Sequence, residues 1–379
     1  MRRAAPALAA AAAWALFAVL AIAIWRQLPG VYPLDGQVDH ALARAFLAGD
    51  NPYTPANIAR YHLGHWAGVG HPPTTGLWFL PLAALPLERL NQALGAVMLA
   101  LLAAHLVLLC RALRFPFASA IAGLLAALIV RQEWFVQHLA IAQISLLIAF
   151  LILVAWLALR EQRDRAAGVA LGLACTLKLF PGVLALYLLV TRRRRAFLAA
   201  VTTYAAFALV ATVRYGPSSW WLFFAQQAPL AKEWVGKSYN ASLEGILLRL
   251  AHPGAAVAPL DGWVPIVYPL LAVALLGATL WWVRRAPLEL SYVLVACVGV
   301  FLNPWVWPHY HALLILPVLV LAAALVRGWR PSAPNVAAAA ALLVAVAIPA
   351  MAWPAAIGAA ALLLRQSTSL SKKLTSFPR

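Results

Sequence analysis

The sequence has few charged residues for its length. Of 379 residues, 11% are charged and 64% are hydrophobic, whereas soluble domains carry about 25% charged residues. This deficit excludes an ordinary water-soluble fold. Apolar runs of roughly 20 residues recur, and each is long enough to span a bilayer. We therefore predict an all-α polytopic membrane protein, with one membrane domain over residues 1–364 and a basic cytoplasmic tail over residues 365–379.

The sequence also lacks the motifs of several enzyme and cofactor-binding classes. It has no P-loop, no glycine-rich dinucleotide fingerprint and no His-Glu-x-x-His. It has no Asp-x-Asp pair either, which argues against a nucleotide-bound donor and a required divalent metal. The cysteines Cys110, Cys175 and Cys297 all lie inside apolar runs, so neither a disulfide framework nor a metal site is expected. We expect no metal and no cofactor.

Positive charge greatly exceeds negative charge. The chain has 29 Lys and Arg against 11 Asp and Glu, a formal net charge of +18. The basic residues lie mainly between apolar runs, as at residues 160–165 and 192–195, which is the positive-inside pattern of cytoplasmic loops. This distribution predicts membrane lipids, rather than nucleic acid, as partners. It also predicts a cytoplasmic N-terminus, with the first apolar run retained as a transmembrane helix.

We expect about 11 to 13 transmembrane or membrane-dipping helices. Residues 168–190 are basic at both ends, so they must cross and return or dip into the membrane as two half-helices. A turn near Lys178 is expected, because Pro181 disfavours helix at the residue before it. The other expected spans cover residues 7–26, 91–110, 117–130, 140–159, 197–213, 263–283, 287–302, 311–326, 333–349 and 352–364.

This topology places most polar residues on the non-cytoplasmic side. The segments between the basic loops hold most of the aspartate, glutamate and histidine residues of the chain. An active site at the outer membrane face is therefore expected. The segments are residues 27–90, 131–139, the turn near Lys178, 214–262 and 303–310.

Two carboxylates form the first candidate site. An amphipathic helix is expected from Asp35 to a stop at Gly49. Asp35, Asp39, Leu42 and Phe46 share one stripe of this helix, so both carboxylates point the same way as apolar residues. A carboxylate in that position needs a partner or a chemical role. The alternative is that Asp35 or Asp39 only caps the start of the helix.

Three other polar residues lie near apolar segments. The ammonium of Lys178 needs an anion or a route to water, and phosphate is a suitable anion. The alternative is a lysine that reaches the interface from a helix end. His71 precedes Pro72-Pro73, which fix an extended chain, and its alternative is a structural role. Gln143 opens an expected span and can bond to a substrate hydroxyl.

Residues 303–311 combine aromatic rings with histidines. Trp307 fits an interfacial aromatic belt, which is the alternative to a binding site. His309 and His311 add hydrogen-bonding groups that such a belt does not need. We therefore treat this segment as part of the candidate site.

Together these segments resemble glycosyltransferase family 87, the polyprenol-phosphate-mannose-dependent α-mannosyltransferases. The chain departs from the family pattern at Asp39, where an aromatic residue is common, at Ala142, where glycine is usual, and at Asn303, where serine is usual. The matches follow the family's order from about residue 35 to residue 311. They are Asp35 ahead of Gly49-x-x-Pro-Tyr53, Pro72-Pro73, Gln143, Gly168 and Gly172 ahead of Lys178 and Pro181, Asn240-x-Ser242-x-x-Gly245 with Arg249, and Pro304-x-x-Trp307-x-His309-Tyr310.

The resemblance implies a GT-C fold, a polyprenyl-phosphate sugar donor and inversion at the anomeric carbon. It implies that Asp35 or Asp39 is the catalytic base, and that Lys178, with His309 or Arg249, binds the donor phosphate. Mannose is the expected sugar, with another hexose or a pentose as alternatives. A lipid or glycan acceptor and a bacterial plasma membrane are expected. The expected substrate-binding residues are Tyr53, His71, Gln143, Asn240, Trp307 and His311.

Two other functions are possible for such a chain, a lipid or sugar transporter or flippase and a non-catalytic membrane scaffold. Transporters keep ionisable residues near the membrane midplane and often have repeated halves. Here the polar residues gather on one expected face, and no internal repeat is visible. This pattern favours the enzyme.

Overall fold

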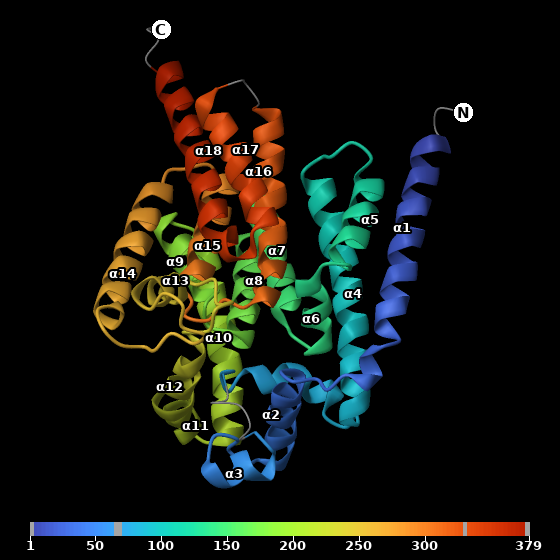
Figure 1. Cartoon of the computed structure of the whole chain (residues 1–379), viewed down its shortest axis with the longest axis vertical. Coiled ribbons are helices and arrows are strands. Elements are labelled where there is room, and N and C mark those ends of the chain that lie inside the picture. Colours follow the sequence, from blue (N-terminus) through green and yellow to red (C-terminus); the bar gives the residue numbers. More distant parts are fainter. Residues whose placement is uncertain (1–3, 64–69, 329–331, 376–379) are drawn as a thin grey trace. The chain divides into compact units, whose positions relative to one another are not determined.

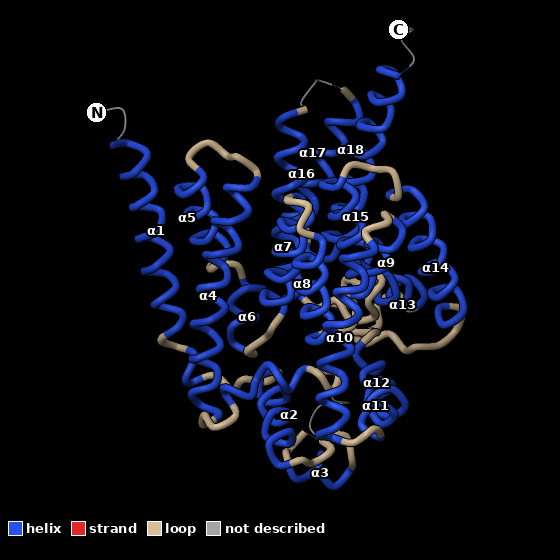
Figure 2. Tube along the Cα trace, turned by 180° about the vertical axis from the view of Figure 1, so that it is seen from behind, coloured by secondary structure: helices blue, strands red, loops and turns tan. Residues whose placement is uncertain are grey.

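The fold is helical throughout the part of the chain that the structure describes. The computed structural model describes residues 4–63, 70–328 and 332–375. Within these ranges every regular element is a helix, and the one β-bridge, between Lys237 and Val257, is isolated. Figure 2 shows the same absence of strands among the described residues. The all-α class expected from the sequence is confirmed.

The chain forms two compact units that alternate along the sequence. Unit 1 holds residues 1–157, 176–178 and 203–231, and unit 2 holds residues 158–175, 179–202 and 232–379. The three-residue piece 176–178 belongs to unit 1 although the residues on both sides of it belong to unit 2.

In unit 1, the first helix packs along the fifth, and the fourth packs on the fifth as well (Figure 1). A methyl group at Gly123 would lie 3.0 Å from the Cβ of Ala13, so the missing side chain allows this close packing. The helices are α1 (Ala4–Trp25), α2 (Gly36–Ala48), α3 (Pro55–Arg60), α4 (Leu87–Ala112), α5 (Ala118–Ile129), α6 (Glu133–Ala140), most of α7 (Ser145–Arg160), the second half of α10 (Arg194–Tyr215), α11 (Ser218–Leu222) and α12 (Ala228–Leu230). Shorter elements are the 3-10 turns Leu28–Gly30 and Thr75–Leu82 and the π-helical segment Phe223–Gln227.

In unit 2, a buried helix, α15, packs against the C-terminal α18. The buried face of α18 is lined by small residues and by Trp353, which is fully buried. The helices are α8 (Asp164–Leu177), α9 (Gly182–Val190), α13 (Leu243–Ala251), α14 (Val264–Val283), α15 (Leu288–Phe301), α16 (Ile315–Arg327), α17 (Ala333–Ala347) and α18 (Ala352–Thr375). The 3-10 turns are Ala231–Trp234, Pro308–Leu314 and Pro349–Met351.

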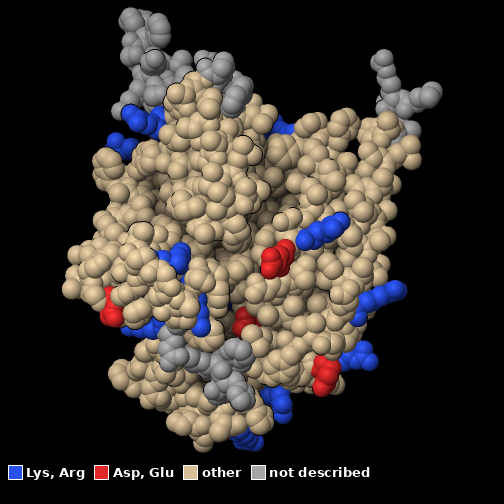
Figure 3. All heavy atoms as spheres, viewed as in Figure 1, with Lys and Arg blue, Asp and Glu red and all other residues tan. Residues whose placement is uncertain are grey.

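Membrane-spanning helices are present in both units. Among the described residues, five helical segments are long and apolar enough to cross a bilayer, and α5 with α6 form a sixth candidate that bends by 74°. Their surfaces expose large apolar side chains, such as Val213 at 77% and Val273 at 73%, and charged side chains are sparse on the face shown in Figure 3. These features confirm a polytopic membrane protein, while the total of 11 to 13 stays a prediction. The five segments are Ala5–Gly30, Leu87–Ala112, Arg194–Tyr215, Val264–Val283 and Pro308–Arg327.

Two segment predictions can be compared with the structure directly. The expected turn near Lys178 is confirmed, because α8 ends at Leu177 and α9 begins at Gly182. Whether this pair crosses and returns or dips as two half-helices stays a prediction. The expected span 140–159 is wrong at its start. Residues 141–144 form a turn, so α7 begins only at Ser145.

The C-terminal boundary at residue 364 stays a prediction. Helix α18 continues through this position to Thr375, and residues 376–379 of the expected basic tail lie outside the described residues.

Candidate active site

The candidate site in unit 1 begins where α2 meets the turn before α7. The backbone N–H groups of Asp35 and Gly36 both donate to the carbonyl oxygen of Ile141, at 3.0 and 3.1 Å. A Cβ at Gly36 would lie 2.5 Å from the Cβ of Ala142, so glycine is needed for this contact. The result is a fixed start for α2 directly beside the turn.

This turn contains a residue in the left-handed backbone region. Ala142 has φ of +55°, a conformation that costs roughly 1–2 kcal/mol for an L-residue and that glycine adopts freely. The following N–H, that of Gln143, donates to His138 O at 3.0 Å and closes the end of α6. The geometry therefore explains why glycine is suited to position 142, where the family pattern usually has it.

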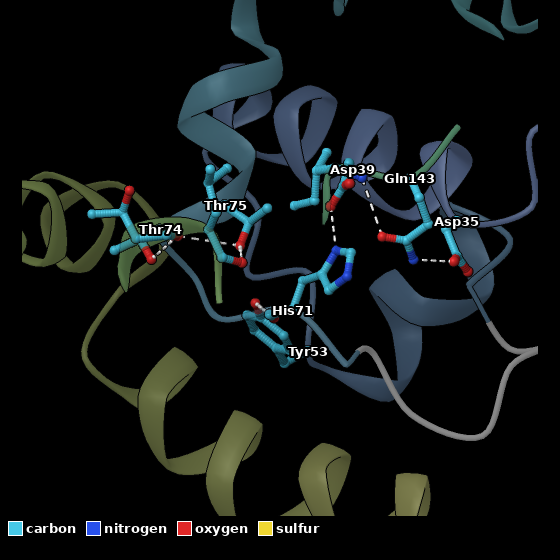
Figure 4. Close-up of polar contacts among 10 residues, drawn as sticks. Asp35, Asp39, Tyr53, His71, Thr74, Thr75 and Gln143 are labelled. Atoms are coloured by element: carbon cyan, nitrogen blue, oxygen red, sulfur yellow. Dashed lines mark hydrogen bonds and ion pairs between the residues drawn. The ribbon is translucent and has the colours of Figure 1, made fainter. Parts of the chain in front are cut away.

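The carboxylate of Asp35 accepts a hydrogen bond from a fixed amide. Gln143 Nε2 donates to Asp35 Oδ2, while Gln143 Oε1 accepts from the backbone N–H of Ile144 at 3.1 Å (Figure 4). The second bond determines which end of the amide faces the carboxylate. Asp35 occupies the N-cap position of α2, but its side chain makes no capping hydrogen bond. The capping role that was the alternative for Asp35 is therefore absent from this structure.

The second carboxylate is more deeply buried and faces a histidine. Asp39 is 1% exposed, and its Oδ1 contacts Nδ1 of His71. Its Oδ2 is buried and has no hydrogen-bond partner among the residues that the structure describes. Tyr53 holds the backbone of the histidine, because its hydroxyl donates to the carbonyl oxygen of His71 at 2.8 Å (Figure 4).

Lys178 belongs to the same unit as the two aspartates, because residues 176–178 are part of unit 1. Burial has the largest influence on the pKa of Asp35 and raises it above its ordinary value. The charge of the Lys178 ammonium has the next largest influence and lowers this pKa, and His71 and Gln143 lower it by smaller amounts. Asp39 adds a smaller contribution that raises the pKa of Asp35 further. Asp35 itself is partly exposed, so it can meet a substrate, whereas Asp39 is almost completely enclosed.

Two residues that sequence reasoning missed hold the chain just before Lys178. Thr74 and Thr75 are fully buried, and their hydroxyls donate to the carbonyl oxygens of Thr176 (2.7 Å) and Leu177 (3.1 Å). A signal was present in the sequence, since these threonines directly follow Pro72-Pro73. Nothing in the sequence, however, identified their partners about 100 residues away.

In unit 2 the predicted site residues centre on Asn240. Its side-chain Nδ2 donates to the carbonyl oxygens of Val235 (2.8 Å) and Pro304 (2.7 Å). Its Oδ1 accepts from the N–H groups of Ser242 (3.1 Å) and Val306 (2.9 Å). The side chain is buried, since the residue is 1% exposed, and protein groups occupy both of its donors and both of its acceptor positions. Asn240 therefore joins the loop before α13 to the loop before the 3-10 turn at residue 308.

Arg249 and Trp307 lie beside this junction. Arg249 Nη1 donates to Asn240 O at 2.7 Å, and burial lowers the pKa of Arg249 from its ordinary value. The Trp307 ring contacts Trp234 and Tyr239, with centroid distances of 5.7 and 5.2 Å. These contacts form an aromatic cluster between two of the expected outer segments, residues 214–262 and 303–310.

The two histidines of the last motif both contact residues of their own turn. His309 is 4% exposed and its ring lies 5.1 Å from that of Tyr310. His311 Nδ1 donates to Pro308 O at 2.5 Å.

The predicted site residues are divided between the two units. The structure places Asp35, Asp39, Tyr53, His71, Gln143 and Lys178 in unit 1, and Asn240, Arg249, Trp307, His309 and His311 in unit 2.

Metal ligands do not cluster in the part of the chain that is described. No group of three or more His, Cys, Asp or Glu side chains in those residues has the arrangement that could hold a metal ion. The expectation of a metal-free site stays a prediction.

The fold and the site define a polytopic helical membrane protein with a partly exposed aspartate whose pKa is lowered by the charge of a lysine ammonium. The family model of glycosyltransferase family 87 matches residues 70–307, well over half of the chain. The chain therefore belongs to glycosyltransferase family 87, as the motifs suggested, and it is a membrane glycosyltransferase.

Two curated proteins are similar over most of the chain. A protein of Mycolicibacterium smegmatis is 29% identical over 356 residues, covering 84% of this chain and 77% of its own length. A protein of Mycobacterium tuberculosis is 27% identical over 318 residues, covering 79% and 71%. Both are named polyprenol-phosphate-mannose-dependent alpha-(1-2)-phosphatidylinositol mannoside mannosyltransferase. No solved structure matches the chain.

Proposed function

We propose that this enzyme transfers mannose from a polyprenyl-phosphate donor to a lipid-linked acceptor at the extracytoplasmic face of the membrane, with inversion at the anomeric carbon. Support for the donor and the sugar comes from the two similar proteins, whose names specify polyprenol-phosphate-mannose and a mannosylated phosphatidylinositol acceptor. The observation that carries the mechanism is the partly exposed carboxylate of Asp35, which accepts a hydrogen bond from Gln143 and whose pKa the charge of Lys178 lowers.

Asp35 acts as the general base in this proposal. Its carboxylate takes the proton of an acceptor hydroxyl, while that oxygen attacks the anomeric carbon of the donor. The bond between the anomeric carbon and the phosphate oxygen breaks, and polyprenyl phosphate leaves. One displacement of this kind inverts the anomeric centre. The raised pKa of Asp35 strengthens the carboxylate as a base, since catalytic pKa values are best near the working pH.

Lys178 supplies positive charge for the phosphate. Its ammonium already opposes the rise in the pKa of Asp35, so it also helps to keep the base ionised. When the bond between the anomeric carbon and the phosphate oxygen breaks, negative charge develops on the phosphate. A fixed cation stabilises that charge in a site with little water. The roles expected for Arg249 and His309 from the sequence stay predictions.

Asp35 is favoured over Asp39 because of exposure and pairing. Asp39 is 1% exposed and its Oδ1 faces His71, so an acceptor hydroxyl has little access to it. Asp35 is partly exposed, and the Gln143 amide donates a hydrogen bond to its carboxylate. We therefore assign Asp39 the role of orienting His71, and Asp35 the proton transfer.

The test is transfer of label in membranes that contain the protein. Membranes would receive radiolabelled polyprenyl-phosphate-mannose and a phosphatidylinositol mannoside. The variants are Asp35→Asn, Asp39→Asn and, as a matched control, Asp261→Asn, whose side chain is 60% exposed in unit 2. We expect Asp35→Asn to lower the rate about 100- to 10,000-fold, and Asp261→Asn to match the wild type. Wild-type rates in Asp35→Asn would reject the assignment of the base, and translocation of donor without transfer would support a transporter instead.

The side of the membrane needs its own measurement. The loop that follows α1 is expected outside the cell, because the basic loops are expected inside. A cysteine introduced at Val31, which is exposed, should react with a membrane-impermeant maleimide in intact cells. A cysteine at Arg163, on the basic turn between α7 and α8, should react only after permeabilisation. The opposite result would place the site in the cytoplasm.

A further inference from the structure

Helix α8 ends with two backbone carbonyls that the helix itself cannot satisfy. In a continuing α-helix, Leu177 O would accept from the N–H of residue 181, but that residue is proline and has no N–H. Pro181 also disfavours the helical conformation for the residue before it, Phe180. The N–H of Phe180 is therefore unsuited to donate to Thr176 O, as it would in a continuing helix. Carbonyls at a helix end need partners from elsewhere when they are buried.

The partners come from a segment about 100 positions earlier. Thr74 Oγ1 donates to Thr176 O at 2.7 Å, and Thr75 Oγ1 donates to Leu177 O at 3.1 Å. Trp78 Nε1 donates to the Thr176 hydroxyl at 2.8 Å. Both threonines are fully buried, so these bonds are not exchanged with water. They explain why residues 176–178 belong to unit 1 while the rest of α8 belongs to unit 2.

The same segment reaches the carboxylates. His71, three residues before Thr74, contacts Asp39 (Figure 4). Pro72 and Pro73 lie between, and each fixes its own φ, so His71 and the threonines are connected by a stiff dipeptide. One segment, residues 71–78, therefore contacts both the helix of the two aspartates and the residues that precede Lys178.

We propose that Thr74, Thr75 and Trp78 are positioning residues that set the ammonium of Lys178 relative to Asp35. The proposal rests on the proposed function, in which Lys178 faces the donor phosphate. In this proposal the side chains act through residues 176 and 177, which they contact, and they do not touch the substrate. Displacement of a catalytic group by about 1 Å can cost about 100-fold in rate, so this support matters for catalysis.

The experiment compares Thr75→Val with Thr75→Ser. Valine keeps the shape of threonine and removes the donor, whereas serine keeps the hydroxyl and is the matched control. We expect Thr75→Val to raise the donor KM, and the inhibition constant of polyprenyl phosphate, by about 5- to 100-fold, the upper end being the cost of misplacing a positioned group by about 1 Å. The KM for the acceptor should stay within about twofold of the wild type, and Thr75→Ser should resemble the wild type throughout.

A double-mutant cycle separates positioning from general damage. If Thr75 acts through Lys178, Thr75→Val should have little further effect on donor KM in a Lys178→Met background, because the group that it positions is gone. An equal fold-change in both backgrounds would overturn the proposal, and so would an unchanged donor KM in folded Thr75→Val. If Thr75→Val fails to fold, Trp78→Phe removes one hydrogen bond from the same segment and is subject to the same two criteria.

This outcome is distinguishable from failure of the proposed function. If the wild type transfers no mannose from polyprenyl-phosphate-mannose, the proposed function fails before any variant is compared. If the wild type transfers mannose and Lys178→Met leaves donor KM unchanged, the phosphate role of Lys178 fails. The positioning role fails alone when Lys178→Met raises donor KM and Thr75→Val does not.

Discussion

The aspartates of unit 1 and Asn240 of unit 2 are both polar groups packed among helices, yet their environments differ. Asn240 has a protein partner for each of its amide donors and for both acceptor positions of its oxygen. Asp39 has a buried oxygen without a hydrogen-bond partner in the described part of the chain. The surroundings of Asp35 raise its pKa, so they disfavour its charged form.

The difference agrees with the proposed roles, in which the aspartates take part in the chemistry and Asn240 holds the fold. A buried polar group with complete hydrogen bonding stabilises one arrangement of the backbone. A carboxylate held in an unfavourable setting lowers stability, and such exceptions to good local design concentrate at functional sites. Asp35 and Asn240 both match the family pattern, but their environments differ.

The largest effect on stability is expected from Asn240→Ala. This substitution leaves the carbonyl of Val235 and the N–H groups of Ser242 and Val306 without this partner, whereas Pro304 O keeps the hydrogen bond from Ser242 Oγ. Unsatisfied buried groups cost about 1–3 kcal/mol each. Because the loops can partly relax, we expect a loss of about 2–4 kcal/mol in the free energy of unfolding. Thermal unfolding of the purified protein in detergent or nanodiscs measures it.

Asp35→Asn supplies the contrasting variant for that measurement. It removes a charge that its surroundings disfavour at neutral pH, so its melting temperature should equal or exceed that of the wild type. A melting temperature for Asn240→Ala that equals the wild-type value would contradict the structural role given to Asn240. A large drop for Asp35→Asn would contradict the difference between the two regions.

A smaller effect is expected from Gln143→Ala, and it concerns pH. The Gln143 hydrogen bond lowers the pKa of Asp35 against the rise caused by burial. Removing it should raise the pKa of Asp35 further. Because the base must be ionised, kcat/KM falls as the pH falls through that pKa, and the acid limb of the profile should move to higher pH in the variant.

The control for this pH shift is Gln137→Ala. Gln137 is an exposed residue of α6, so its loss should leave the acid limb unchanged. An acid limb that does not move in Gln143→Ala would separate Asp35 from the proton transfer. A shift to lower pH would contradict the sign of the Gln143 contribution.

Much of the helical architecture follows from local patterns in the sequence. The run from Asp35 to Gly49 predicts α2 correctly, and Gly49 has the left-handed φ of +77° that a glycine stop provides. Pro181 predicts the break between α8 and α9. These features depend on residues a few positions apart, so the sequence contains all the information they require.

The site is only partly visible in the sequence, because its key contacts join distant segments. The candidates Asp35, Asp39, His71, Gln143 and Lys178 are recognisable as polar residues in apolar surroundings. The pairing of Asp39 with His71 and the donation from Thr75 to Leu177 span 32 and 102 positions. Polar periodicity predicts that a carboxylate needs a partner, but it does not identify which partner.

The smallest expected effect comes from Ala142→Gly, which tests whether unit 1 retains backbone strain beside its base. Ala142 has φ of +55°, which costs an L-residue roughly 1–2 kcal/mol. Glycine removes this cost but loses about 0.4–1 kcal/mol through the greater freedom of the unfolded chain. We therefore expect a net gain of up to about 1.6 kcal/mol in the free energy of unfolding, with the pH profile unchanged.

The matched control is Ala140→Gly, two residues earlier in the last turn of α6. Glycine in a helix lowers stability by roughly 0.5–1 kcal/mol relative to alanine, so the two substitutions should have opposite signs. Thermal unfolding of both variants measures the difference. A loss of stability at position 142 as large as that at position 140 would show that the turn beside Asp35 carries no strain. A gain at position 142 without a change in kcat/KM would show that the backbone strain is separable from the proton transfer.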